Sequence, residues 1–434
     1  MRRHVEASDN LCALMRDHLP PKIFNRLEEV GRLAEQAGVA AFAVGGLVRD
    51  LLLGHKNLDV DITVEGDGMA FARLLADHYK GGLKIFERFA TAYVICPDGF
   101  KLDVASARRE NYAHPTALPT VASSSIKEDL YRRDFTINAL AIHLNTHHFG
   151  EVIDCYGGWR DLKKKTIRVL HDRSLVDDPT RVFRAIRFAQ RFGFRIENNT
   201  LRLLKETVAN DLIHQLSGPR LRNEIMLLLS EKDPHRAIRR LAEFDLLRFL
   251  HSSLKLIPSL ETLLARIPRA IAWWNTRFAD RSLDHSLVYF MGLVEGVSDS
   301  AIRAMMKRLT IPNRQASKVH MVRSSLSSAL RGLSMSRRPK PSETYRLLAA
   351  LPDEGLVLLV AKARSPHVKR SLTTCLTKYQ HVKPSLTGNA LTAMGLQPGP
   401  LYKKILDRLL DARLNGEVKT EADERALAKK IAKL

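Results

Sequence analysis

The spacing of apolar residues predicts that the first part of the chain alternates helices and strands. Residues 22–38 place apolar side chains three and four positions apart, which is typical of a helix, and the pattern stops at Gly38. Residues 39–44, "VAAFAV", form a short apolar run typical of a buried strand, whereas residues 58–64, "LDVDITV", alternate as a half-buried strand does. The first part of the chain is therefore predicted to be a mixed α/β domain.

The pattern changes character near residue 170. Before that point residues 68–79 have helical spacing, and residues 91–96 and 100–107 resemble two further strands separated by the turn "PDG". From about Arg173 onward nearly every segment has helical periodicity. The expected fold class is α+β, with a mixed α/β head followed by an all-α neck, body and tail.

Length and these changes of pattern predict how the chain is divided. A chain of 434 residues has room for about three domains of ordinary size. The predicted parts are an N-terminal extension at 1–20, the head at 21–155, a neck at 156–230, a helical body at 231–345 and a helical tail at 346–434.

The charge balance indicates a polyanionic partner. Lys and Arg outnumber Asp and Glu by 69 to 47, so the formal net charge is +22. Nucleic acid is the first candidate partner, and a negatively charged membrane surface is the second. No apolar stretch approaches the roughly 20 residues that cross a bilayer. The opening "MRRHVEASDN" leads into no apolar segment, so no secretory signal is expected.

Cysteine usage predicts the cellular compartment. The four cysteines lie far apart, with neither CxxC spacing nor a Cys/His pattern that would bind zinc: Cys12, Cys96, Cys155 and Cys375. Neither a disulfide framework nor a zinc site is expected. A reducing cytoplasm fits this usage.

Two aspartates one residue apart are the first candidate catalytic residues. Because side chains alternate along a strand, Asp59 and Asp61 would project from one face while Leu58, Val60 and Ile62 face the core. Two carboxylates this close repel each other unless a cation lies between them, and hard oxygen ligands suit Mg²⁺. The alternative is a solvated strand edge, which is the commoner meaning of an isolated pair of this kind.

A third carboxylate extends the candidate metal site. The segment "KLDVAS" places Asp103 on an adjacent predicted strand, flanked by Leu102 and Val104. Three carboxylates on neighbouring strands can hold two metal ions for in-line phosphoryl transfer. We therefore predict that Asp59, Asp61 and Asp103 are the catalytic and metal-binding residues.

A glycine turn before the aspartates favours this catalytic interpretation. Gly45 and Gly46 end a strand ahead of a short helix, where backbone amides form a natural cradle for phosphate. Arg49 lies one helical turn further on. A glycine pair alone more often marks a turn, but here the pair, the arginine and the two aspartates fall within the 17 residues from Gly45 to Asp61.

These residues resemble a known family. "VGGLVRDLLLG" followed by "LDVDI" is similar to the signature of the polymerase-β nucleotidyltransferase superfamily, in the branch of bacterial-type (class II) tRNA nucleotidyltransferases and poly(A) polymerases. "EDLYRRDFTINALAI", "DDPTRVFRAIRFAQRFGF" and "LSGPRLRNEI" resemble later motifs of that family in the same order, and "LTGNALTAMGLQPGPLYKKIL" resembles its C-terminal region. The resemblance implies a polymerase-β-like head and template-independent nucleotide addition to RNA.

The resemblance also implies roles for the segment "RRDFTIN". It implies that Arg133 and Asp134 line the nucleotide pocket and that Asn138 reaches the sugar. The spacing alone would place Asp134 and Asn138 four apart on one face of a helix. The alternative is an ordinary helix start that Asp134 caps.

The segment 177–194 resembles the family's base-selecting helix. By this resemblance Asp178 and Arg181 bind the base of the incoming nucleotide, and Arg184 and Arg187 extend the same basic stripe. The residues that would hold the triphosphate are Gly45, Gly46, Arg49, Arg133, Arg184 and Arg187.

Hydrogen-bond chemistry explains how an Asp/Arg pair could select a base without a template. A carboxylate accepts hydrogen bonds and a guanidinium donates them. Adenine and cytosine each present an amino donor beside a ring-nitrogen acceptor, which satisfies both partners. Guanine and uracil present the reverse pattern and would leave buried groups unpaired. Asp178 and Arg181 therefore predict the use of ATP, CTP or both.

A long basic stretch in the helical body is the predicted RNA-binding surface. From Ile302 to Ser342 the chain carries many cations and no acidic residue. Helices with this charge could follow the backbone of a folded RNA such as tRNA, although a charge run is usually only a solvated face. The predicted RNA-binding residues are Arg303, Lys307, Arg308, Arg314, Lys318, Arg337 and Arg338. The helical tail at 346–434 is predicted to bind RNA as well.

Taken together, the sequence predicts an enzyme that adds C, A or both to the 3′ end of tRNA, using Mg²⁺ and releasing pyrophosphate. Addition of CCA, of CC or of A alone all remain open. Two rival predictions remain: a poly(A) polymerase on the same fold, and a non-catalytic protein that binds structured RNA. Crowded carboxylates disfavour the second rival, because they would repel RNA.

Overall fold

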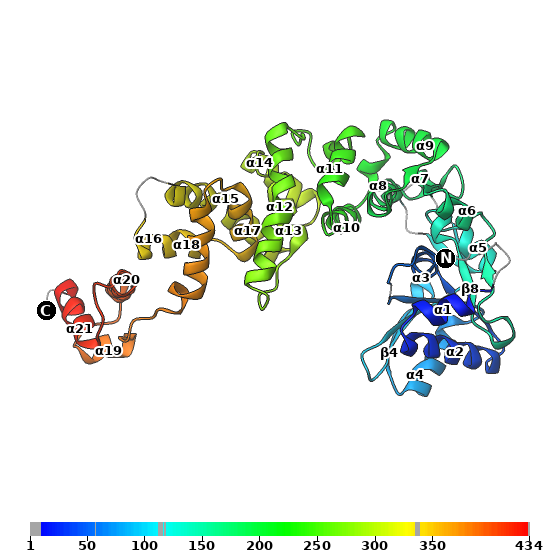
Figure 1. The fold of residues 1–434 in the computed structure, drawn as a ribbon, viewed down its shortest axis with the longest axis horizontal. Helices are drawn as coiled ribbons and strands as arrows, with labels where there is room; N and C mark the ends of the chain where they lie inside the picture. The colour runs from blue at the N-terminus through cyan, green and yellow to red at the C-terminus, as the bar shows by residue number, and fades with distance from the viewer. Residues whose placement is uncertain (1–9, 57, 112–115, 117–118, 335–338, 433–434) are drawn as a thin grey trace. The chain divides into compact units, whose positions relative to one another are not determined.

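The chain folds into two units, which are described separately. The first comprises residues 1–224 and 243–249, and the second comprises residues 225–242 and 250–434. The predicted division into five parts stays a prediction. The computed structural model describes residues 10–56, 58–111, 116, 119–334 and 339–432 (Figure 1).

A seven-stranded sheet is the centre of the first unit, and its strands run in the order β3-β4-β5-β2-β1-β8-β9. Strands β2 and β5 are parallel, whereas the other neighbours are antiparallel. The strand bounds are β1 Ala40–Val44, β2 Val60–Glu65, β3 Gly82–Phe86, β4 Thr91–Ile95, β5 Lys101–Ser106, β8 Ala141–His143 and β9 Val152–Ile153.

Alternation along β2 gives the sheet two different faces. Val60, Ile62 and Val64 are buried, whereas Asp61 between them is exposed. Leu58 was predicted to face the core but is 57% exposed, because the strand begins two residues later at Val60. One face of the sheet is therefore apolar and covered, and the other carries the predicted catalytic carboxylates.

Two helices cover the apolar side, α2 (Pro21–Gln36) and α4 (Gly68–Tyr79). A proline in its first turn starts α2, where the missing N–H costs nothing. The carboxylate of Asp67 caps α4 by accepting hydrogen bonds of 3.0 Å from the amides of Met69 and Ala70. The helices predicted from apolar spacing at 22–38 and 68–79 are thus confirmed.

The rest of the first unit adds short strands and the helices that follow the head. Strands β10 and β11 form a two-residue parallel pair inside the region predicted to be wholly helical, because so short a pairing leaves no periodic pattern. The remaining bounds are α1 Cys12–His18, α3 Gly46–Leu53, β6 Arg108–Asn111, β7 Thr120–Ser123, α5 Ile126–Tyr131, α6 Gly158–Lys163, β10 Thr166–Ile167, α7 Ser174–Asp177, α8 Thr180–Phe192, β11 Arg195–Ile196, α9 Asn198–Ala209 and α10 Gly218–Leu229. Residues 225–229 of α10 belong to the second unit.

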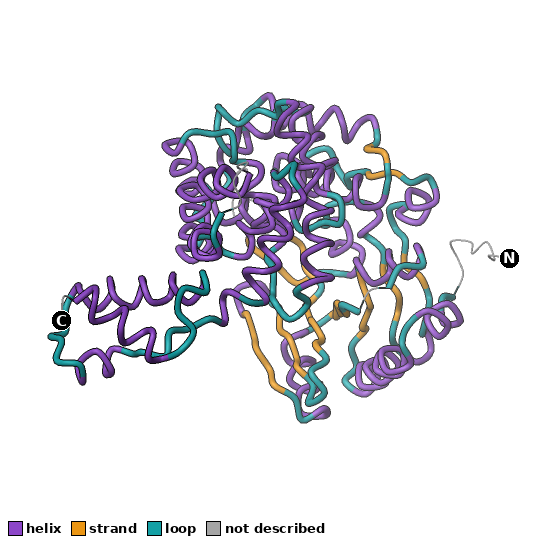
Figure 2. Tube along the Cα trace, turned by 60° about the vertical axis from the view of Figure 1, so that its left-hand side comes forward, coloured by secondary structure: helices purple, strands orange, loops and turns teal. Residues whose placement is uncertain are grey.

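The described residues of the second unit form helices joined by loops and no strand, and with the sheet of the first unit this confirms the predicted α+β class (Figure 2). No helix among the described residues is long and apolar enough to cross a membrane. The bounds are α11 Pro234–Glu243, α12 Pro258–Arg277, α13 His285–Leu293, α14 Asp299–Arg308, α15 Asn313–Ser334, α16 Pro341–Ala349, α17 Asp353–Lys362, α18 Pro366–Thr377, α19 Gly388–Ala393, α20 Pro400–Leu414 and α21 Glu421–Ala432.

Candidate active site

Two of the three predicted catalytic carboxylates are direct neighbours across a strand pair. Asp61 on β2 and Asp103 on β5 are register partners in the parallel pairing, so both project from the open face of the sheet. Protein atoms crowd around Asp61 although it still meets solvent. This desolvation, reinforced by the negative charge of Asp103, raises the pKa of Asp61 above its ordinary value. Asp59 lies just before the strand begins.

The donor set fits a hard divalent cation, although no such ligand cluster is already assembled. Among the described residues no group of three acidic, histidine or cysteine side chains is gathered as a metal site. The Asp103 carboxylate instead binds the Lys101 ammonium at 2.7 Å. Carboxylate oxygens on neighbouring strands are suitable ligands for a divalent metal, and the Lys101 ammonium competes with a metal for the Asp103 carboxylate.

The turn between β1 and α3 requires glycine and packs against an arginine. Gly45 has a φ of 66°, which favours glycine, and a β-carbon at this position would lie 2.8 Å from Nη1 of Arg133. The N-terminus of α3 begins at Gly46, so its free amides and the Arg133 guanidinium lie close together. This arrangement can hold a phosphate group.

A buried carboxylate anchors the arginines of the "RRDFTIN" segment. Asp129 is fully buried, and it binds Arg132 at 2.6 Å and Arg133 at 2.9 Å. Burial alone would raise the pKa of Asp129, but the charges of Arg133 and Arg132 outweigh it, and the pKa is lowered. Arg132 also binds Glu110 of β6 at 2.9 Å. The two guanidinium groups are therefore held in fixed positions.

Asp134 and Asn138 contact each other, but not on an α-helix as predicted. Asp134 lies two residues before a short 3₁₀ turn at Thr136–Asn138, Asn138 is the last residue of that turn, and the Asn138 amide donates to Asp134 at 2.9 Å. Both Asp134 oxygens are occupied, because Arg184 also binds this carboxylate with contacts of 2.6 and 2.8 Å. Burial would raise the pKa of Asp134, yet the Arg184 charge lowers it to about 2.

Arg49 is 5% exposed and largely occupied by protein contacts. Its guanidinium donates two hydrogen bonds to Asp50, at 2.8 and 2.9 Å, and one to the Asn138 side chain. The same group lies over the rings of Phe188 and Phe192. Arg49 thus links α3 to the 3₁₀ turn and to α8.

Arg184 and Arg187 on α8 share one buried carboxylate. Glu224 on α10 lies 3.6 Å from Arg184 and 3.5 Å from Arg187. Burial raises the pKa of Glu224, whereas the two arginines oppose that rise. Arg187 is itself buried and lies over the Phe188 ring. Its contacts join α8 to α10.

The predicted base-selecting pair lies at the start of α8 and is held in place. Arg181 is buried and donates to the Ser174 hydroxyl at 2.6 Å and to the Arg132 carbonyl at 2.7 Å. Asp178 accepts hydrogen bonds from Thr180 and from Arg220 of α10, the latter at 2.7 Å. The guanidinium and the carboxylate are therefore oriented before any nucleotide binds.

Most of the predicted catalytic and nucleotide-binding residues line one pocket of about 410 Å³, large enough for a small-molecule ligand. Asp59, Asp103 and Arg187 are not among the lining residues. The predicted residues in the pocket are Gly45, Gly46, Arg49, Asp61, Arg133, Asp134, Asn138, Asp178, Arg181 and Arg184.

Three further lining residues were not predicted as site residues: Glu110, Arg132 and Phe188. Arg132 is next to Arg133 in the sequence, so its charge was visible there. No pattern in the sequence around Glu110 indicates that it is a site residue, because β6 brings it to the pocket from a distant segment.

Comparisons with family models and with known proteins identify the family of this chain. The chain matches the "Poly A polymerase head domain" over residues 41–168 and the "Probable RNA and SrmB- binding site of polymerase A" over residues 193–268. It is 32% identical to an A-adding tRNA nucleotidyltransferase of Halalkalibacterium halodurans, over 98% of this chain and 96% of that protein. The chain belongs to the tRNA nucleotidyltransferase and poly(A) polymerase family. The resemblance inferred from the motifs is thereby confirmed.

Another relative of this family member is longer. The A-adding tRNA nucleotidyltransferase of Geobacter sulfurreducens is 42% identical over 96% of this chain, but the chain spans only 48% of that protein's length. Solved structures cover the whole chain. An apo CCA-adding enzyme superposes with a TM-score of 0.82 at 35% identity, covering 99% of this chain and all of that one. The Thermotoga maritima CCA-adding enzyme complexed with tRNA has a TM-score of 0.76 at 34% identity, with 99% of both chains covered.

Nucleotidyltransferases of this family generally use a divalent metal ion.

The basic stretch of this family member contains two kinds of cation. Lys318 on α15 binds the buried Glu354 of α17 at 2.6 Å, and Arg308 is half-buried. By contrast, Arg303, Lys307 and Arg314 are exposed on α14 and α15. Arg337 and Arg338 lie outside the described residues.

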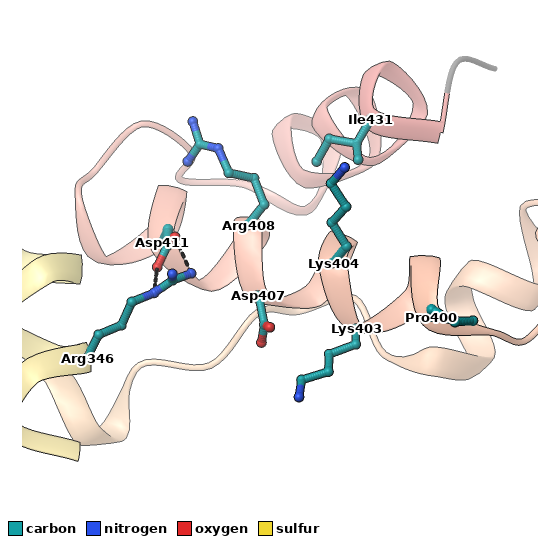
Figure 3. Close-up of a pocket in the computed structure, with 8 residues that line it drawn as sticks. All are labelled: Arg346, Pro400, Lys403, Lys404, Asp407, Arg408, Asp411 and Ile431. Carbon is teal, nitrogen blue, oxygen red and sulfur yellow. Dashed lines mark hydrogen bonds and ion pairs between the residues drawn. The ribbon is translucent and has the colours of Figure 1, made fainter. Parts of the chain in front are cut away.

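A second basic surface lies in the predicted tail (Figure 3). Lys403 and Lys404 on α20 line a cleft of about 610 Å³, which Arg346 of α16 and Asp411 also line. Arg346 binds Asp411 there with contacts of 2.5 and 3.0 Å. Cations at such a cleft suit a phosphate backbone. This surface supports the prediction that the tail also binds RNA.

Proposed function

We propose that this chain is a template-independent nucleotidyltransferase that transfers AMP, CMP or both to the 3′ end of tRNA. One observation carries the proposal: the predicted base-selecting pair lies in the same pocket as a catalytic carboxylate and a glycine turn suited to phosphate. A pocket that selects a base with side chains needs no template strand. An enzyme that acts on tRNA would fit the cytoplasmic location that the cysteine usage predicts.

The proposed reaction is an in-line displacement. The 3′-oxygen of the RNA attacks the α-phosphorus of the nucleotide, the bond to the bridging oxygen of the β-phosphate breaks, and pyrophosphate leaves as the hydroxyl proton passes to solvent. Asp59, Asp61 and Asp103 would hold Mg²⁺, which supplies activation of the hydroxyl and neutralises the leaving group. Arg133 and the amides of α3 would hold the triphosphate.

Several other predicted nucleotide-binding residues fit a supporting role within this proposal. Asp134 binds Arg184 and Asn138, and Arg49 binds Asn138 and Asp50. These contacts leave Asn138 one amide proton, which fits a contact with the nucleotide sugar. Arg49, Asp134 and Arg184 would then act mainly by fixing the position of the pocket wall.

Among the nucleotides allowed by Asp178 and Arg181, we propose that A is the one added in the cell. The two relatives named above, at 42% and 32% identity, are A-adding enzymes. Complete CCA addition is the alternative, since the superposing structures are of CCA-adding enzymes.

The deciding experiment offers four RNAs to the purified chain with each nucleotide in turn. Three are tRNAs that end before CCA, after C and after CC, and the fourth is an unstructured RNA. We expect one A to be added to the tRNA that ends after CC, with little addition to the others. CTP incorporation on the shorter tRNAs would show CC or CCA addition, and long A tracts on unstructured RNA would show a poly(A) polymerase. No incorporation on any RNA would contradict the proposed activity.

The exposed cations of the body give a prediction about RNA binding. Replacing Arg303, Lys307 and Arg314 by glutamate should raise the KM for tRNA and lower the log–log slope of its salt dependence, by about 0.9 per lost phosphate contact if the duplex DNA value applies. The KM for the nucleotide should stay unchanged. Steady-state kinetics at several salt concentrations measure both quantities.

A charge-matched control separates RNA contact from net charge. Arg32, Arg73 and Lys80 are exposed cations on or next to α2 and α4, the helices on the covered face of the sheet. Reversing these three changes the net charge equally and should leave the KM for tRNA near that of the parent. Equal effects of the two triple variants would argue that the basic stretch acts only through overall charge.

A further inference from the structure

The open face of the sheet continues beyond the predicted catalytic carboxylates. Strand pairing places Asp61, Asp103, Tyr93 and Lys84 in one row across β2, β5, β4 and β3. Register partners on adjacent strands project from the same face. The pocket residue Asp61 thus stands at one end of this row, and Tyr93 and Lys84 lie on the far side of Asp103.

Exposed aromatic and basic side chains surround the far end of that row. Phe86 and Ile95, each two residues along a strand from a member of the row, are 41% and 44% exposed. The Phe86 and Tyr93 rings lie 5.9 Å apart, centroid to centroid. The Lys84 ammonium lies 5.4 Å from the Phe86 ring centroid, and the Lys101 ammonium lies 4.8 Å from that of Tyr93. We call Lys84, Phe86, Tyr93, Ile95 and Lys101 the β3–β4 platform.

The platform is not needed for packing of the head. The opposite face of the same strands contacts α4, and it buries Ala92 and Val94 of β4 together with Leu102 and Val104 of β5. The core of this region is therefore complete without Phe86 or Ile95. Exposed apolar side chains that gather in one place usually mark a binding surface.

We propose that the β3–β4 platform binds the unpaired 3′-terminal nucleotides of the RNA that is being extended. This inference rests on the proposed function, because it assumes an RNA 3′-hydroxyl at Asp61 and Asp103. The nucleotide pocket is built by the end of β1, α3 and α8. Along the sheet the platform lies on the other side of the carboxylates, where the second substrate must approach.

The chemistry of the platform suits single-stranded RNA. Aromatic rings stack on bases of any sequence, and nearby cations bind the backbone phosphates. Phe86 and Tyr93 supply the rings, and Lys84 and Lys101 supply the cations. Neighbouring strands are about 5 Å apart, so the platform begins one strand from Asp103.

The platform includes residues of β3, which is the edge strand of the sheet and offers a place where a second chain could pair. Two features favour RNA over that partner. Lysine on an edge strand, here Lys84, disfavours strand addition. The platform also shares its face and its row of residues with the catalytic carboxylates rather than lying apart from them.

Fluorescence tests this inference without catalysis. Phe86→Trp in the full chain keeps an aromatic ring on the platform, and the signals of the three native tryptophans are subtracted with the parent protein. We expect quenching by a tRNA that ends in unpaired nucleotides. The same tRNA trimmed to a blunt acceptor end should bind without that quenching.

Kinetics supply the second test. The double variant Phe86→Ala, Tyr93→Ala should raise the KM for tRNA about 5- to 100-fold, the range expected when stacking on aromatic rings is lost, with little change in the KM for ATP. Leu83→Ala is the matched control, because Leu83 lies on β3 next to Lys84, is 38% exposed and faces the opposite side.

These outcomes distinguish the inference from the proposed function. If no RNA accepts a nucleotide from the parent chain, the proposed function fails. If the parent is active but the double variant keeps its KM for tRNA, and Phe86→Trp responds equally to both RNAs, the platform inference is overturned. A change in sedimentation of the double variant without a change in KM would identify the platform as a contact between copies of the chain.

Discussion

Replacing Asp61 by alanine should abolish nucleotide addition, with kcat lowered at least about 10³-fold, while the affinity for tRNA stays nearly unchanged. A metal site contributes several kcal/mol of transition-state stabilisation, and each 1.4 kcal/mol is about tenfold in rate. Asp61 is the predicted metal ligand that also lines the nucleotide pocket, and it faces Asp103 across the strand pair. Single-turnover incorporation and filter binding measure the two quantities separately.

A carboxylate on the covered side of the sheet provides the control for this variant. Asp77 is exposed on α4, which packs on the opposite face from Asp61. Asp77→Ala removes the same charge from the head and should leave incorporation unchanged. Near-normal incorporation by Asp61→Ala would contradict the metal assignment, and loss of tRNA affinity would indicate a folding defect instead.

The second large effect is expected at Arg181. Arg181→Ala should lower the preference for the correct nucleotide over UTP and GTP by about 10²-fold, the scale set by an unpaired buried hydrogen-bonding group. Use of the correct nucleotide should also weaken. Competition among the four nucleotides on one tRNA measures the preference directly.

Arg191→Ala controls for the loss of a cation from the same helix. Arg191 lies near the end of α8, is exposed, and does not line the pocket. Its removal should leave nucleotide choice intact. If Arg181→Ala selected among the four nucleotides as the parent does, Asp178 and Arg181 could not be the groups that select the base.

Neighbouring residues hold Asp178 and Arg181 in place. Arg220 binds Asp178, and the Arg132 carbonyl together with the Ser174 hydroxyl binds Arg181. Selection by hydrogen bonding needs donors and acceptors in fixed directions, because a mobile pair could adapt to the wrong base. We therefore expect Arg220, Ser174 and the Arg132 carbonyl to contribute to base selection by holding Asp178 and Arg181 in place.

Much of this protein could be predicted from the order of its residues. Local periodicity located α2, α4, β2, β4 and β5, because the buried side of each element repeats with the element's own period. A short continuous apolar run located β1, which is buried on both sides. The glycine turn, the paired aspartates and the "RRDFTIN" segment are contiguous, so their chemistry is visible without a fold. Family resemblance then assigned roles to residues that spacing alone left open.

Tertiary structure decided what depends on pairing between distant segments. The parallel register of β2 and β5 sets Asp61 opposite Asp103, and the next strand pair sets Tyr93 beside them. Register is a property of two strands, so neither sequence segment contains it alone. Glu110 lines the pocket for the same reason, because β6 brings it there from a distant segment of the chain.

The sequence also does not show which charged side chains are buried. In the sequence Arg303 and Lys318 look alike, yet Lys318 neutralises the buried Glu354 whereas Arg303 is exposed. The sequence likewise does not show that Asp50 binds Arg49 and that Asp134 binds Arg184. The predicted contact of these two arginines with the triphosphate stays a prediction. The composition fixes how many charges the chain has. Only the folded structure determines which of them have a buried partner and which face solvent, because that depends on the residues packed around each one.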